Sequence, residues 1–168
     1  VPYLKAYAGQ KGKWTNVDFY QLGYAYYKQN DFKKAIGEFN KIINGNNAIA
    51  QNAYYHLGES YINLDKKQEA LNAFRRASEM DFDAKIKEDA WLNYAKLSYD
   101  IGNPYLSTPQ VLSDFLERYP KSPFRESIEL LLVDSYMSSK NYKEALLLLE
   151  SNMRNALKPN YQKVAFYR

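Results

Sequence analysis

Hydrophobic residues recur along the chain with the spacing of amphipathic helices. Within segments of about 13 to 16 residues they fall at positions i, i+3, i+4 and i+7, and short polar stretches such as residues 29–31, 64–66 and 139–141 separate the segments. The six prolines fall in expected first turns or between segments, where a missing backbone N–H costs little. No segment alternates apolar and polar residues for long enough to indicate a strand. The pattern predicts an all-α chain of helix–turn–helix pairs.

Six side chains repeat at a period of 35 residues, at offsets 0, 3, 4, 7, 16 and 20. The first copy is Phe19, Leu22, Gly23, Tyr26, Ala35 and Phe39, and the second is Tyr54, Leu57, Gly58, Tyr61, Ala70 and Phe74. A third copy begins at Trp91 and resumes four residues late at Val111, because residues 102–109 form an inserted loop. A fourth copy has Glu129 where the others have an aromatic residue. Such a period is the mark of a stacked repeat architecture.

The repeat sets the expected boundaries of a single array. We expect the second helix of a preceding repeat and a linker over residues 1–15, repeats over residues 16–50, 51–85, 86–124 and 125–159, and the start of a following repeat over residues 160–168. Since the chain lacks an initiating Met and stops within a helical pattern, we also expect it to be a segment of a longer protein.

The glycine of the repeat requires a packing reason, because glycine inside a helix costs about 1 kcal/mol relative to alanine. For the second copy we expect Gly58 to allow close approach of the partner helix at Ala70. Phe74 is then expected to fill the space between one repeat and the next. The same roles are expected at the matching positions of the first copy.

The aromatic, Leu-Gly, Tyr, Ala, Phe pattern at this period resembles the tetratricopeptide repeat (TPR). The resemblance covers essentially the whole chain and implies a right-handed α-solenoid of about four units with partial repeats at both ends. It also implies that first helices line a concave groove. Residues 115–124 resemble the inter-repeat junction of bacterial envelope proteins, and the chain is similar to Bacteroidetes-type multi-repeat TPR proteins. This likeness implies the bacterial cell envelope or periplasm, with the cytoplasm as the alternative.

The expected function is a non-catalytic scaffold that binds a peptide or protein segment in a tyrosine-rich groove. The chain holds 17 Tyr, and tyrosine gives rigid, amphipathic contact area. Mapping the groove positions of the resembled family onto this sequence selects Tyr20, Tyr24, Tyr27, Tyr55, Glu59, Lys96 and Tyr99. Two alternatives stay open: these tyrosines pack structurally, or the chain self-assembles into a homo-oligomer or a larger envelope complex.

The composition limits the catalytic and metal-binding sites that the chain can form. The chain has no Cys and one histidine, His56, which we interpret as structural. Its seven glycines are scattered along the sequence and do not form a glycine-rich phosphate-binding loop. No metal, cofactor or catalytic residue is therefore expected. No stretch approaches the roughly 18 apolar residues that a membrane span requires.

The charge does not favour nucleic acid as a partner. The net charge is +4, and the basic pairs at residues 33–34, 66–67 and 75–76 are interleaved with acidic residues on expected second helices. We therefore expect no nucleic-acid binding. Among the alternative functions, a helical-repeat RNA binder is less expected than self-assembly.

Overall fold

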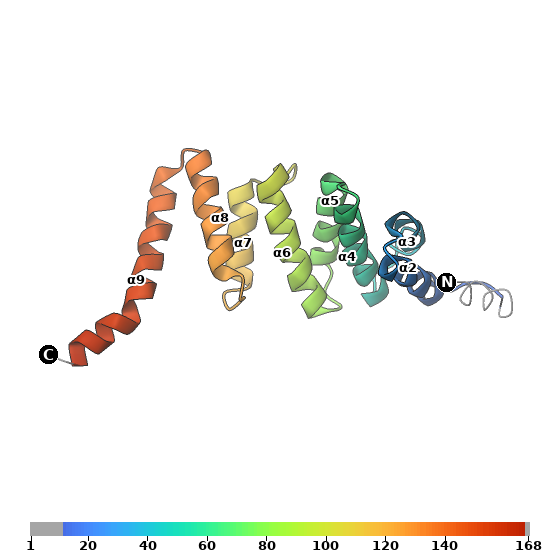
Figure 1. Cartoon of the computed structure of the whole chain (residues 1–168), viewed down its shortest axis with the longest axis horizontal. Helices are drawn as coiled ribbons and strands as arrows, with labels where there is room; N and C mark the ends of the chain where they lie inside the picture. The colour runs from blue at the N-terminus through green and yellow to red at the C-terminus, as the bar shows by residue number, and fades with distance from the viewer. Residues whose placement is uncertain (1–11, 167–168) are drawn as a thin grey trace. The chain divides into compact units, whose positions relative to one another are not determined.

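The computed structural model describes the backbone of residues 12–166 and side chains as far as residue 154. Within this range every regular element is an α-helix (Figure 1), as the repeat predicts. The helices are α2 (Asn16–Lys28), α3 (Phe32–Phe39), α4 (Ala48–Asn63), α5 (Lys67–Glu79), α6 (Ala84–Ile101), α7 (Thr108–Arg118), α8 (Arg125–Ser138) and α9 (Tyr142–Phe166). The helix expected before the first full repeat lies outside the described residues.

The chain divides into two compact units, unit 1 (Val1–Ile101) and unit 2 (Gly102–Arg168). The division falls at the inserted loop, so the expected repeat over residues 86–124 contributes α6 to unit 1 and α7 to unit 2. The loop is shorter than the sequence predicts. Because Pro109 suits the first turn of a helix, α7 already begins at Thr108.

Over its described residues, 12–101, unit 1 contains two helical hairpins and a fifth helix. Helix α2 pairs with α3 and α4 with α5; α3 also contacts α4, and α5 packs on α6. The first helices α2, α4 and α6 contact one another in turn, which gives unit 1 a face formed by first helices. The repeated apolar side chains fill its interior: Leu22, Ala35, Phe39, Leu57, Ala70 and Phe74 are all buried.

The repeated glycine makes room for an aromatic ring. A Cβ atom on Gly58 would lie 2.7 Å from the ring of Phe74, and one on Gly23 would lie 2.8 Å from the ring of Phe39. The atoms nearest to Gly58 thus belong to the Phe74 ring on the partner helix α5, so it is this ring that the glycine accommodates. Phe39 does reach the next hairpin, where its ring stacks 5.8 Å from that of His56.

The hairpin turns share one geometry. Their central residues, Asn30, Asp65 and Lys140, have φ angles of 60°, 56° and 61°, in the left-handed region. In each turn the following backbone N–H donates to a tyrosine carbonyl five residues earlier, at 2.9, 2.8 and 2.8 Å in chain order. This pattern satisfies carbonyls that a helix end leaves unpaired. The polar turns predicted from the sequence thus end the first helix of each hairpin in the same way.

The buried side chain of Gln51, on α4, bridges the end of α5 and the start of α6. Gln51 is fully buried, and its Nε2 donates to the carbonyls of Ala77 and Met80 at 3.1 and 2.6 Å. Its Oε1 accepts from the backbone N–H groups of Phe82 and Asp83 at 3.2 and 2.7 Å. One side chain from α4 thus satisfies four backbone groups of the connection, a role that the repeat pattern does not indicate.

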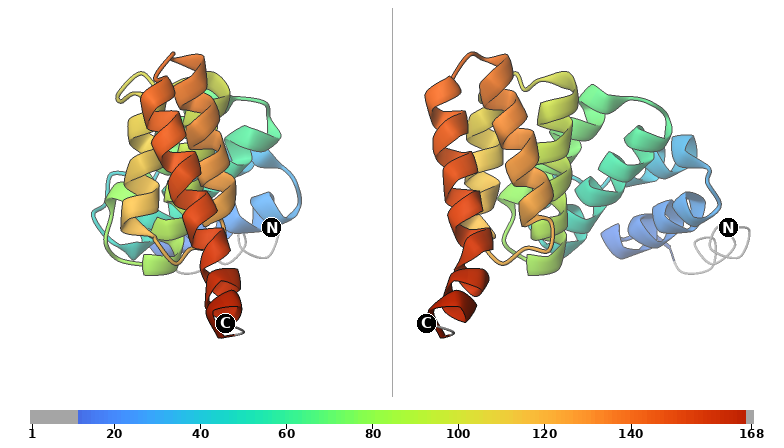
Figure 2. Two further views of the ribbon diagram at one scale, coloured as in Figure 1. Left: turned by 90° about the vertical axis from the view of Figure 1, so that its left-hand side faces the viewer. Right: turned by 60° about the vertical axis from the view of Figure 1, so that its left-hand side comes forward.

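Unit 2 contains α7, α8 and α9 side by side, with α8 in contact with both neighbours (Figure 2). Glu129, the acidic residue in the aromatic slot, is buried and forms an ion pair with Arg125 at 2.7 Å. Its charge is therefore compensated one helical turn away.

Helix α9 runs without interruption from Tyr142 to Phe166, although the repeat predicts a boundary after residue 159. That prediction is wrong, because Pro159 lies inside the helix; proline can be accommodated there with a lost hydrogen bond and a bend. The ribbon of α9 bends towards its C-terminal end (Figure 1). Within the described residues, no helix combines the length and the hydrophobicity needed to cross a membrane.

Candidate functional site

Five of the seven predicted groove residues come together with a histidine on the face formed by α2 and α4. We call this group, Tyr20, Tyr24, Tyr27, Tyr55, His56 and Glu59, the tyrosine cluster. The spacing of the three α2 tyrosines places them along one helix face. The ring of Tyr24 stacks against those of Tyr20 and Tyr27, at centroid distances of 6.3 and 6.1 Å.

His56 lies in the middle of these rings. Its imidazole centroid is 5.2 Å from the rings of Tyr24 and Tyr27, 5.6 Å from Tyr55 and 6.1 Å from Tyr20. Its side chain is 13% exposed. Sequence reasoning left His56 out of the site, because nothing in its spacing distinguishes it from a structural histidine.

Glu59 interacts with His56 and with two tyrosines of the cluster. Its Oε2 lies 2.8 Å from Nδ1 of His56, one turn earlier on α4. Its negative charge also raises the pKa of the Tyr27 and Tyr55 hydroxyl groups. One carboxylate therefore acts on side chains from both first helices.

Burial and acidic neighbours raise the pKa of three of the cluster's tyrosines. The pKa of Tyr27 is raised to about 12, first by burial and then by the negative charge of Glu59. Burial, followed by Glu59 and Asp89, raises the pKa of Tyr55, and burial is also the main cause that raises the pKa of Tyr20. These phenols therefore act as neutral hydrogen-bond donors at physiological pH.

Part of the cluster is open to solvent. Tyr24 is 39% exposed, whereas the other three tyrosines are half-buried. The Nζ of Lys28 lies 5.9 Å from the Tyr24 ring. Lys96 and Tyr99, the remaining predicted groove residues, lie on α6; both are exposed, and neither belongs to the tyrosine cluster.

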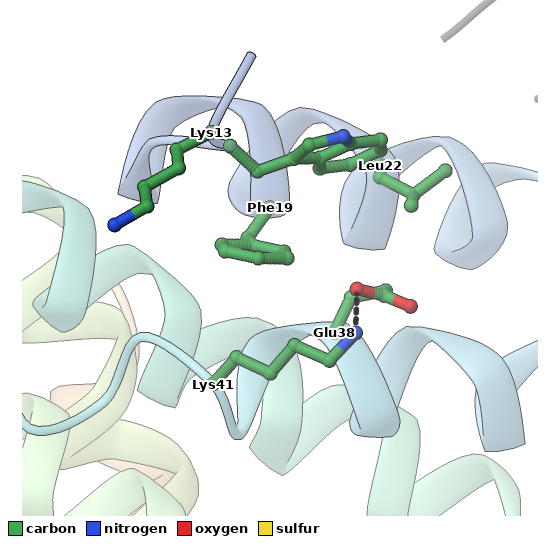
Figure 3. Close-up of a pocket in the computed structure, with 6 residues that line it drawn as sticks. Lys13, Phe19, Leu22, Glu38 and Lys41 are labelled. Carbon is green, nitrogen blue, oxygen red and sulfur yellow. Dashed lines mark hydrogen bonds and ion pairs between the residues drawn. The ribbon is translucent and has the colours of Figure 1, made fainter. Parts of the chain in front are cut away.

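A separate cavity of about 490 Å³ lies between α2 and α3 (Figure 3), and its lining residues are Lys13, Trp14, Phe19, Leu22, Glu38 and Lys41. Trp14 and Phe19 form its aromatic wall, with their centroids 5.3 Å apart. Lys41 lies 5.0 Å from the Phe19 ring and pairs with Glu38 at 2.6 Å. Sequence reasoning did not select this cavity, because Phe19 and Leu22 belong to the packing positions of the repeat.

The part of the chain with described side chains contains no group of three or more His, Asp or Glu residues that could hold a metal ion. What the tyrosine cluster offers is ring faces, neutral hydroxyl donors and a carboxylate in fixed positions. This combination suits the recognition of another molecule.

Comparisons with known proteins place the chain among helical-repeat proteins. The family model described as anaphase-promoting complex, cyclosome, subunit 3 matches residues 4–77. No curated protein matches the sequence.

Solved structures match over nearly the whole length of the chain. The crystal structure of MamA aligns with a TM-score of 0.63 at 17% identity, covering 94% of this chain and 87% of MamA. A Podosopora anserina kinesin light chain with nearly identical TPR-like repeats aligns with a TM-score of 0.60 at 14% identity, covering 92% of this chain and 82% of its own. At these identities the likeness concerns the fold. The 35-residue period, the helical hairpins and these structural neighbours thus show that the chain has an α-helical repeat fold, similar to that of TPR-like repeats.

Proposed function

We propose that unit 1 binds a peptide or a segment of another protein across the tyrosine cluster, without catalysing a reaction. Repeat folds of the tetratricopeptide type generally serve as protein-interaction modules. The observation that carries the proposal is the arrangement around Tyr24, whose exposed ring stacks with those of Tyr20 and Tyr27 and lies 5.2 Å from that of His56. Such a surface offers large aromatic contact area.

The cluster is organised before any ligand arrives. His56 is hydrogen-bonded to Glu59, and its ring packs against all four tyrosine rings, which restricts the rotamers of these side chains. Binding then costs less side-chain entropy than it would on a surface of freely rotating residues. This favours recognition over a purely structural role for the exposed ring.

The charge distribution supports a protein partner over a nucleic acid. Several basic residues of the second helices take part in ion pairs, as Lys34 does with Asp31 at 2.8 Å and Arg76 with Glu79 at 3.2 Å. Pairing of this kind disfavours the continuous basic surface that phosphate binding requires. Location at the cell envelope stays a prediction from the junction at residues 115–124.

The proposal is tested with peptides selected from a random display library against the whole chain. Isothermal titration then compares the wild type with Tyr24→Ala, and with Tyr105→Ala as a matched control, because Tyr105 is a similarly exposed tyrosine in the loop before α7. Tyr24→Ala is expected to weaken binding at least tenfold, as for a central aromatic contact. The control is expected to bind like the wild type. Equal affinities for all three proteins would contradict the proposal.

A further inference from the structure

Helix α9 carries an exposed stripe of apolar side chains. The stripe consists of Tyr142, Leu146, Leu149 and Met153, which are 56, 57, 41 and 63% exposed. Their spacing of four, three and four residues places them on one face of the helix, in the pattern of a coiled-coil seam. The helix packs on α8 through a neighbouring face, where Ala145 is buried.

Two opposite charges flank the stripe on the side away from Ala145. Lys143 and Glu150 are seven residues apart, so they lie on the same edge of the stripe, and both are exposed. In the single chain Glu150 also lies 3.6 Å from Arg154, a long surface ion pair of little energetic weight.

The stripe and its charges are self-complementary when the helix is reversed. If two α9 helices run antiparallel, Leu146 of one lies against Leu149 of the other, and the two ends of the stripe meet in the same way. Lys143 then lies beside the partner subunit's Glu150, and Glu150 beside the partner subunit's Lys143. A parallel pair would instead place these charges beside the uncharged edge that contains Ala145 and Asn152.

We propose that two copies of this chain associate through an antiparallel pair of α9 helices. The contact is isologous: each subunit presents the same apolar stripe and the same two charges, so the assembly closes as a dimer. Its contact residues all belong to unit 2, whereas the tyrosine cluster belongs to unit 1.

Sedimentation equilibrium of the 168-residue chain tests the apolar part of the proposal. The wild type is expected to be a dimer, and Leu146→Glu a monomer with an unchanged circular dichroism spectrum, since Leu146 is largely exposed. Leu147→Glu is the matched control, because Leu147 is equally exposed, at 56%, on another face of the same helix. This control is expected to remain dimeric. A monomeric wild type, or dimers that persist in Leu146→Glu, would overturn the proposal.

Charge reversal tests whether the two α9 helices of the dimer run antiparallel. Lys143→Glu and Glu150→Lys each place like charges opposite one another twice in the dimer, and each is expected to weaken association by about tenfold. The double variant restores both attractions, so it is expected to dimerise like the wild type. Additive weakening in the double variant would overturn the antiparallel pairing, and association only with a different protein would overturn the choice of a second copy.

Discussion

At the scale of single residues, the repeated glycine and phenylalanine form one packing unit. The ring of Phe74 occupies the space that a side chain at position 58 would need, and Phe39 does the same beside Gly23. Interiors of proteins are close-packed, so the ring has little room to move aside. The lower helix stability that glycine causes is therefore offset by the burial of an aromatic side chain.

Gly58→Ala is expected to destabilise the chain by about 1 to 3 kcal/mol, because the new methyl group overlaps the Phe74 ring. Gly37→Ala is the control: it also lies inside a helix, but nothing lies within 4 Å of its added Cβ. This control is expected to stabilise the chain by about 0.5 to 1 kcal/mol. Urea unfolding followed by circular dichroism measures both, and a Gly58→Ala protein as stable as Gly37→Ala would rule out the overlap.

The raised pKa of Tyr27 makes stability depend on alkaline pH. Its pKa is about 12 in the folded protein and close to 10 in the unfolded chain, so the unfolded chain loses this proton first. The corresponding stability is present below about pH 10 and is lost as the pH rises towards 12. Tyr27→Phe removes this contribution. Urea unfolding measured at about pH 8 and about pH 11 gives the free energy of unfolding at each pH. Between these values the free energy of unfolding is expected to fall less in Tyr27→Phe than in the wild type. Equal falls in the two proteins would contradict a role for the Tyr27 hydroxyl.

At the scale of helices and turns, the connections are held by a few polar groups. The left-handed residues Asn30, Asp65 and Lys140 end three helices in the same manner, and Gln51 satisfies the connection between α5 and α6. Buried polar groups are costly when a partner is removed, so Gln51 is the more sensitive of these features.

Gln51→Leu is expected to lower the free energy of unfolding by about 3 kcal/mol or more, since it leaves buried carbonyl and N–H groups without partners. Asn52→Ala is the control, because this neighbouring amide donates only to the Ala48 carbonyl near the surface. Its loss is expected to cost less than about 1 kcal/mol. Hydrogen exchange at the Asp83 amide gives a local readout: unchanged protection in Gln51→Leu would disprove the role of the side chain.

The sequence predicts the elements well because each repeated residue has a local cause. The 3.6-residue periodicity defines the helices, and the recurring Leu, Tyr and Ala positions identify buried faces before any coordinates are known. Five of the seven selected groove residues also gather in one cluster. His56 and Gln51 could not be selected in this way, because their roles depend on contacts with other helices. The uninterrupted course of α9 was missed because proline usually marks a boundary.

At the scale of the whole molecule, the inserted loop separates two compact units. It follows α6 and precedes α7, and it exposes Tyr105 and Leu106 at 48 and 45%. Exposed loop residues are preferred sites of proteolysis. The loop is thus the point at which the chain is most open to cleavage between the units.

Limited digestion with chymotrypsin is expected to cut first after Tyr105 or Leu106. Mass spectrometry identifies the fragments, and replacing both residues with Ser is expected to slow the first cut severalfold. A first cut inside α4 or α5 would mean that unit 1 opens more readily than the loop, against the division of the chain described here.

The most direct test of the account is to locate a bound peptide on the folded chain. Amide chemical-shift perturbation by NMR, with a peptide selected for binding, reports which helices the ligand touches. We expect the largest changes on α2 and α4 around Tyr24, Tyr27 and Glu59, while α3 and α5 change little. Changes concentrated on α3 and α5, with α2 and α4 unaffected, would contradict it.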